Sequence, residues 1–98
     1  TLFVIVADHG HRLPREYKTA YDVLKFRIPL VFYGEVIKDE YKKLAIDKIG
    51  SQTDIAHTLL NQLNINDSSY TWSKDLFNKN SKGFAFYSYD NGLGWVDE

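Results

Sequence analysis

The sequence predicts an α/β fold in which apolar strands pack against at least one amphipathic helix. Residues 2–7 and 28–34, with the sequences LFVIVA and IPLVFYG, are continuous apolar runs rich in β-branched residues. Runs of this kind are typical of strands that are covered on both faces, as in a parallel α/β sheet. A helical pattern follows Gly50, and residues 84–96 alternate as in a β-hairpin.

The segment between the two apolar runs is about twenty residues long, which is enough for a crossover connection between parallel strands. It is polar with scattered aromatic residues, and residues 15–25 are interpreted either as a short helix or as a loop. Farther along, residues 43–50 (KLAIDKIG) alternate loosely and predict a short strand.

The clearest helix is predicted over residues 53–63. Ser51 and Asp54 have the spacing of a capping box, with Ser51 as the N-cap and the Asp54 carboxylate reaching back to the Ser51 N–H. Thr53 is the alternative cap. Four apolar residues share one face of this helix: Ile55, Leu59, Leu60 and Leu63.

The C-terminal segment predicts a hairpin over residues 84–96. The sequence DNG at residues 90–92 is a strong tight-turn signal between two alternating runs. Its aromatic residues are interpreted as a packing surface, with a platform for stacking glycans as the alternative. They are Phe84, Phe86, Tyr87, Tyr89 and Trp95.

Composition excludes several functional classes. The 98 residues carry 12 basic and 13 acidic side chains and a net charge of -1, which gives no reason to expect a nucleic-acid partner. The absence of cysteine excludes disulfides, a thiol nucleophile and cysteine-bound zinc within these residues. No apolar run approaches the roughly 20 residues that a membrane-spanning helix needs.

The first apolar run ends in Asp8, His9 and Gly10. In open α/β sheets, ligands bind beyond the carboxyl ends of the strands. A carboxylate and an imidazole side by side can both ligate a divalent metal, and glycine lets the backbone turn sharply beside them. The alternative is an ordinary turn in which Asp8 bonds to backbone amides and His9 faces water.

Two further segments follow in order: FRIPLVFYG at residues 26–34 and GSQTDIAHTLLNQLNI at residues 50–65. Together with LFVIVADHGHRLP at residues 2–14, they resemble the C-terminal part of the catalytic domain of the sulfatase-like branch of the alkaline phosphatase superfamily. This branch includes arylsulfatases, lipoteichoic acid synthases and other phosphoglycerol transferases. The SKDLF sequence at residues 73–77 and the aromatic hairpin are more similar to the lipoteichoic acid synthases.

The resemblance implies a partial alkaline-phosphatase-like sheet, with strands 2–7 and 28–34 and helix 53–63, followed by the hairpin 84–96. It implies that residues 1–98 are a single C-terminal fragment of a larger catalytic domain. It also implies an extracytoplasmic, membrane-associated enzyme, although this segment contains no membrane span of its own.

By the same resemblance, Asp8 and His9 are metal ligands. The metal is manganese or magnesium in a phosphoglycerol transferase and calcium in a sulfatase. The nucleophile, a threonine or a formylglycine, lies upstream of this segment, so no catalytic nucleophile is expected here. None of the threonines considered matches it: Thr1, Thr19, Thr53 and Thr58.

The expected function is therefore metal-dependent chemistry on phosphate or sulfate esters, with phosphoglycerol-type transfer as the first choice. A true, formylglycine-dependent sulfatase is the alternative within the family. A catalytically silent structural or binding fragment is the alternative outside it.

Other polar residues are weaker candidates. His11 and Arg12 follow the ligand pair, and both side chains can contact a phosphate or sulfate group. Arg27 is interpreted as a residue that holds the loop after the first strand. A metal pair of Asp54 and His57 is geometrically possible on the helix, but a structural role is favoured.

Overall fold

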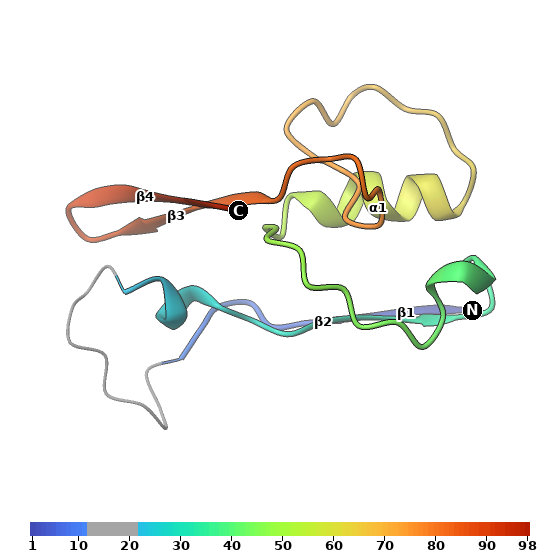
Figure 1. The fold of residues 1–98 in the computed structure, drawn as a ribbon, viewed down its shortest axis with the longest axis horizontal. Coiled ribbons are helices and arrows are strands. Elements are labelled where there is room, and N and C mark those ends of the chain that lie inside the picture. Colours follow the sequence, from blue (N-terminus) through green and yellow to red (C-terminus); the bar gives the residue numbers. More distant parts are fainter. Residues whose placement is uncertain (12–21) are drawn as a thin grey trace.

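The computed structural model describes residues 1–11 and 22–98. Figure 1 shows two layers, one formed by β1 and β2 and the other by α1 and the β3–β4 hairpin lying end to end. The strands and the helix are β1 (Leu2–Val6), β2 (Leu30–Gly34), α1 (Asp54–Gln62), β3 (Phe84–Tyr89) and β4 (Gly92–Asp97). The structure thus confirms the coarse prediction of a mixed helix-and-strand fold with a C-terminal hairpin.

Strands β1 and β2 pair in antiparallel fashion, with Phe3 opposite Tyr33 and Ile5 opposite Val31. The predicted parallel crossover between them is therefore wrong. A run of apolar residues predicts a buried strand, but it does not indicate whether that strand is parallel or antiparallel to its neighbour. The described part of the connection holds a short 3-10 helix (Val23–Phe26), and most of the helix considered over residues 15–25 lies outside the described residues.

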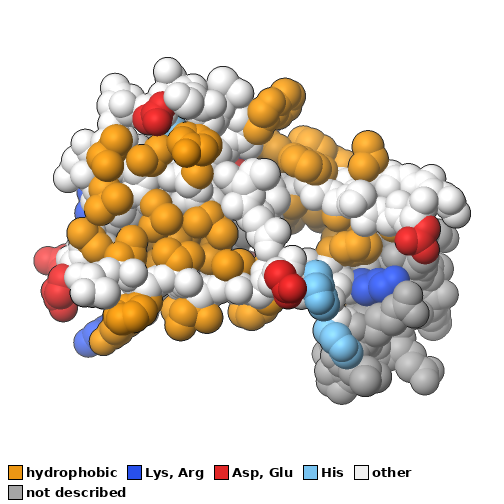
Figure 2. Space-filling model, turned by 180° about the vertical axis from the view of Figure 1, so that it is seen from behind, with side chains coloured by type: hydrophobic (Ala, Val, Ile, Leu, Met, Phe, Trp, Pro, Cys, Tyr) orange, Lys and Arg blue, Asp and Glu red, His pale blue; other side chains and the backbone are white. Residues whose placement is uncertain are grey.

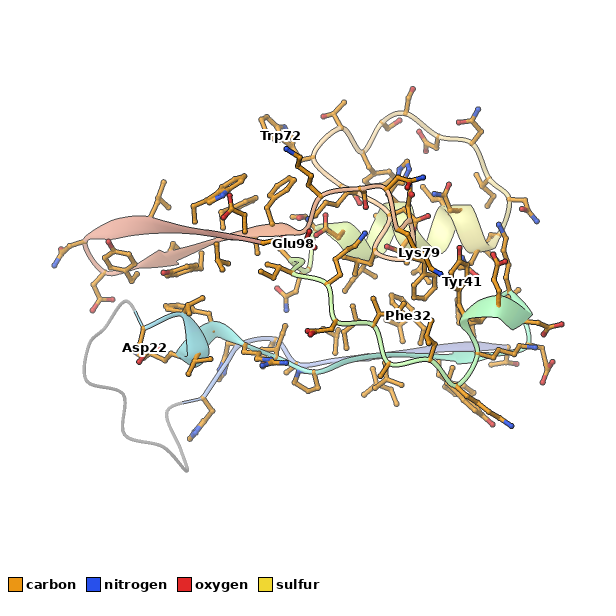
Figure 3. All side chains as sticks on the ribbon, viewed as in Figure 1. Asp22, Phe32, Tyr41, Trp72, Lys79 and Glu98 are labelled. Atoms are coloured by element: carbon orange, nitrogen blue, oxygen red, sulfur yellow. The ribbon has the colours of Figure 1, made fainter. Side chains whose placement is uncertain are left out.

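The two faces of the β1–β2 sheet differ in exposure. On one face Phe3, Ile5 and Tyr33 are 54%, 62% and 69% exposed. On the other face Phe32 meets Phe77 edge to face, with ring centroids 5.5 Å apart. Figure 3 shows Phe32 between the two layers. Among residues 1–11 and 22–98, therefore, side chains cover only one face of the sheet.

The strand predicted over residues 43–50 is wrong, because this segment forms no ladder. Lys43 has a positive φ of 59°, which strand residues do not adopt. The segment is held through a side chain instead. The Lys48 ammonium donates to the carbonyl and hydroxyl oxygens of Ser81, each at 2.9 Å, and to the carbonyl of Asn78.

Helix α1 buries a polar stripe. Asp54, Thr58 and Gln62 stand at i, i+4 and i+8 and are 0%, 0% and 4% exposed. The predicted apolar stripe is only partly covered, and its last residue, Leu63, is 42% exposed. The helix itself was predicted correctly, but its apolar face is not its most buried face.

Hydrogen bonds explain why polar residues occupy this buried stripe. The Thr58 hydroxyl donates to the Asp54 carbonyl at 2.7 Å and accepts from the Leu76 N–H at 2.9 Å. The Gln62 side-chain oxygen accepts from the Lys38 N–H at 2.9 Å. Both side chains thus bond to backbone N–H groups of loops, and that of Leu76 would otherwise be buried without a partner.

The Asp54 carboxylate has four donors, of which the Ser51 hydroxyl is the most distant at 3.5 Å. It accepts from the Ser51 N–H at 2.8 Å and from the Lys74 N–H at 3.0 Å, and it forms an ion pair with the Lys74 ammonium at 2.5 Å. The predicted contact between the Asp54 side chain and the Ser51 N–H is confirmed. The N-cap is Thr53, however, and its side chain makes no capping hydrogen bond. The Asp54 N–H bonds to the Ser51 carbonyl and not to the Ser51 hydroxyl.

Lys74 extends this network to the hairpin. Its ammonium donates to the Phe84 carbonyl at 2.8 Å and lies 4.0 Å from the centre of the Phe84 ring. The Phe84 ring in turn stacks on Trp95 of β4, with centroids 4.7 Å apart. One buried ion pair therefore joins the start of α1, the loop around residue 74 and the hairpin.

We expect the variant Asp54→Ala to destabilise the protein by about 3–5 kcal/mol, because it leaves the Lys74 ammonium buried without its partner. Chemical denaturation of the protein measures this loss. The matched control is Asp47→Ala at an exposed position, which should change stability by less than about 0.5 kcal/mol. A similar, small effect for both variants would contradict the role given to Asp54.

Candidate functional site

The predicted ligand pair lies where the chain bends directly after β1. The His9 N–H donates to the Asp8 carboxylate at 2.9 Å. The side chains of Asp8 and His9 are 91% and 71% exposed, so both are accessible. The contact between the carboxylate and a backbone amide is also what the ordinary-turn alternative predicts.

The His9 ring is oriented by the backbone. Its Nδ1 lies 2.7 Å from the Gly10 carbonyl oxygen. A carbonyl can only accept, so in the neutral ring Nδ1 carries the proton and Nε2 keeps its lone pair. Backbone carbonyls orient metal-ligating histidines in this way, and this tautomer leaves the Nε2 lone pair able to ligate a metal.

The distance between the two side chains is short enough for a shared metal ion. His9 Nε2 lies 3.7 Å from an Asp8 carboxylate oxygen. Two ligands that each bind a metal at about 2.1 Å can be at most about 4.2 Å apart. Among the described residues, no group of three or more potential ligands forms. Asp8 and His9 are therefore a candidate for part of a coordination shell.

Gly10 is required by close packing. A Cβ atom at this position would lie 1.9 Å from the Lys25 carbonyl oxygen and 3.1 Å from the Phe26 Cα. These are backbone atoms, which cannot swing aside as the end of a side chain can. The third residue of the DHG sequence is therefore fixed by the chain segment that precedes β2.

Sequence analysis missed Gln52. Its side-chain amide donates to the Ala7 carbonyl at 2.7 Å and to the Asp8 carbonyl at 3.2 Å. Gln52 lies in the turn before α1, 44 residues from Asp8 in sequence. No local sequence pattern predicts a contact between residues so far apart in sequence. Gln52 is, however, part of the GSQTD sequence that supports the family resemblance.

The structure does not gather the weaker candidates into one site. His11 is exposed after the bend, and Arg12 lies outside the described residues. Arg27 is exposed, and its N–H closes the 3-10 helix by donating to the Leu24 carbonyl. The Asp54 carboxylate is already engaged by Lys74 and backbone donors, which supports the structural role favoured for it.

The hairpin divides its aromatic side chains between two faces. Phe86 and Trp95 face each other across the strands and are 48% and 59% exposed. On the opposite face Tyr87 packs against Phe26, with centroids 4.5 Å apart. Packing thus accounts for the second face. On the first face Phe84 stacks on Trp95, while Phe86 and Trp95 stay about half exposed. A hollow of about 260 Å³ beside Trp95 is lined by residues 82–84, 95, 97 and 98, and the Asp8 turn contributes none of its lining.

Comparisons with models of protein families, with curated proteins and with solved structures find no match for this chain. The resemblance to the sulfatase-like branch therefore stays a prediction that rests on the three sequence segments. None of the helices in the described ranges is long and apolar enough to cross a membrane.

We expect Gly10→Ala to displace the Asp8–His9 bend, because the added methyl group meets backbone atoms of Lys25 and Phe26. Overpacking of this kind costs about 1–3 kcal/mol. Thermal unfolding measures the loss, and histidine ring ¹⁵N shifts report whether His9 keeps its Nδ1–H tautomer. Unchanged stability together with an unchanged tautomer would contradict the close approach.

Proposed function

We propose that this chain is the C-terminal part of the catalytic domain of a sulfatase-like enzyme of the alkaline phosphatase superfamily. The enzyme acts on phosphate or sulfate esters, with phosphoglycerol-type transfer as the first choice. Asp8 and His9 supply two ligands to its divalent metal. The observation that carries the proposal is the 3.7 Å approach of His9 Nε2 to the Asp8 carboxylate at the end of β1.

The arrangement of the three resembling segments supports this proposal. Strand β2, from the second segment, pairs with β1 along its whole length. Gln52, from the third segment, bonds to the backbone where β1 ends. Segments that are separate in sequence thus converge on the Asp8–His9 bend, which is expected if their shared task is to build that site.

The expected metal is manganese or magnesium, or calcium in a sulfatase. When bound, such an ion supplies positive charge that offsets the charge on phosphate or sulfate oxygens. Asp8 offers a carboxylate and His9 offers Nε2, and the Gly10 carbonyl holds the imidazole ring in place. Additional ligands and the nucleophile would come from the rest of the catalytic domain.

The apolar surface supports a larger domain. Among the described residues, three hydrophobic side chains are buried: Ile37, Leu76 and Phe77. Figure 2 shows a broad hydrophobic area on one face of the molecule. Monomeric proteins rarely expose large continuous apolar patches without a partner. We propose that the rest of the catalytic domain covers this area, in an enzyme that works outside the cytoplasm and is associated with the membrane.

Two alternatives remain. A true sulfatase would share the Asp8–His9 site and differ in its nucleophile, so a formylglycine precursor motif of the C/S-x-P-x-R type in the upstream sequence would favour it. A catalytically silent fragment is favoured by one observation, namely that no third metal ligand joins the pair among the described residues.

The variants Asp8→Ala and His9→Ala, made in the full-length protein, test the proposal. We expect each to lower turnover of phosphate or sulfate esters by at least about 100-fold, since even residues that only support metal ligands contribute 10–100-fold. Mn²⁺ affinity, measured by the EPR signal of free Mn²⁺, should fall with it. The control Asp90→Ala, at an exposed hairpin turn, should change neither quantity.

Wild-type turnover in both ligand variants would show that the metal-ligand assignment is wrong. The isolated 98-residue chain serves as a negative control, because the proposed nucleophile lies outside it. Esterase activity from this chain alone would contradict that part of the proposal.

A further inference from the structure

We propose that Gln52 is a positioning residue that fixes the bend at Asp8 and His9 and thereby sets the distance between their side chains. The contact itself is observed, and its role in metal binding rests on the proposed function. Gln52 belongs to the turn before α1, while the bend follows β1, so one side chain links the helix to the end of the strand.

The hydrogen bonds of the Gln52 amide require a bent backbone. The two N–H groups of one amide nitrogen can serve two acceptors, and here the acceptors are the consecutive carbonyls of Ala7 and Asp8, at 2.7 and 3.2 Å. In an extended strand, consecutive carbonyl groups point toward opposite edges. They reach one donor only if the chain turns between them, so Gln52 stabilises the bent conformation over a straight one.

The direction of the Asp8 carbonyl controls the ligand pair. The Asp8 carbonyl and the His9 N–H belong to the same planar peptide unit. Holding the carbonyl therefore also directs the His9 N–H, which donates to the Asp8 carboxylate at 2.9 Å. The carboxylate and the start of His9 are thus placed relative to each other by the peptide that Gln52 holds.

Gly10 holds the other end of the bend. Its Cα packs so closely against the backbone of Lys25 and Phe26 that no side chain fits between them. Its carbonyl oxygen accepts from His9 Nδ1 at 2.7 Å. The bend is therefore fixed from the helix side by Gln52 and from the β2 side by Gly10.

Gln52 itself is anchored by the start of α1. Its carbonyl accepts from the Ile55 N–H at 3.2 Å. The preceding residue, Ser51, donates its N–H to the buried Asp54 carboxylate at 2.8 Å. The backbone of Gln52 is consequently held by two hydrogen bonds of the same turn. Its Cα is therefore fixed relative to the bend that its side chain contacts.

The test uses Gln52→Met in the full-length protein, since methionine has a similar length and no N–H donor. In the metal-free protein, we expect the ring ¹⁵N shifts of His9 to move from a single Nδ1–H tautomer toward a mixture. In the presence of Mn²⁺, we expect the dissociation constant to rise about 10–100-fold, as for other residues that orient ligands.

Two further variants serve as controls. Thr53→Val changes the neighbouring exposed residue and should leave both the His9 signature and the Mn²⁺ affinity unchanged. Gln52→Lys keeps N–H donors on a side chain of comparable length and should restore the His9 tautomer in the metal-free protein. If Gln52→Met fails to fold, Gln52→Asn, whose amide is one methylene short, gives the same comparison.

Gln52→Met with the wild-type His9 tautomer and the wild-type Mn²⁺ affinity would overturn the inference. So would a loss of the tautomer that leaves Mn²⁺ affinity unchanged, because Gln52 would then hold the bend without positioning the ligands. If the wild-type protein binds no Mn²⁺, the proposed function fails, and the tautomer comparison alone decides whether Gln52 fixes the bend.

Discussion

The arrangement of this chain depends on the buried carboxylate of Asp54. A charge that is removed from water is costly unless it is paired and hydrogen-bonded. Asp54 meets both conditions through the Lys74 ammonium and the N–H groups of Ser51 and Lys74. Because Lys74 also bonds to the Phe84 carbonyl, the same ion pair attaches the hairpin. The polar stripe of α1 thus accepts hydrogen bonds from the surrounding loops. These loops cover the polar stripe, and the apolar stripe is less deeply buried.

The candidate site is connected to Asp54 through a series of hydrogen bonds. Asp54 fixes the turn before α1, this turn presents Gln52, and Gln52 bonds to the backbone at Ala7 and Asp8. Asp8 and His9, the proposed ligands, are exposed, and we propose that a buried network at the start of the helix sets their geometry. Exposed functional groups that are positioned by a rigid interior are the usual arrangement at the ends of strands.

Patterns within a segment could be predicted, and contacts between segments could not. The apolar runs located β1 and β2 to within about two residues, and the alternation located the hairpin. Antiparallel pairing could not be inferred, because a run of apolar residues has no direction. Residues 43–50 alternate without forming a strand, since Lys48 binds the loop at Ser81 instead. Asp8 and His9 could be proposed as site residues because they directly follow a strand and belong to the segment that carries the family resemblance, and this stays a prediction. The contact of Gln52 with Asp8 spans 44 residues of sequence and had no local signal.

The chain combines an open apolar surface with Asp8 and His9, the pair of side chains that we propose as part of a metal site. Both features are expected of one portion of a larger catalytic domain. Anomalous diffraction at the manganese edge, from crystals of the full-length protein grown with Mn²⁺, tests this most directly. We expect a peak within about 2.3 Å of both an Asp8 carboxylate oxygen and His9 Nε2. A fully occupied Mn²⁺ site that neither residue contacts would contradict it.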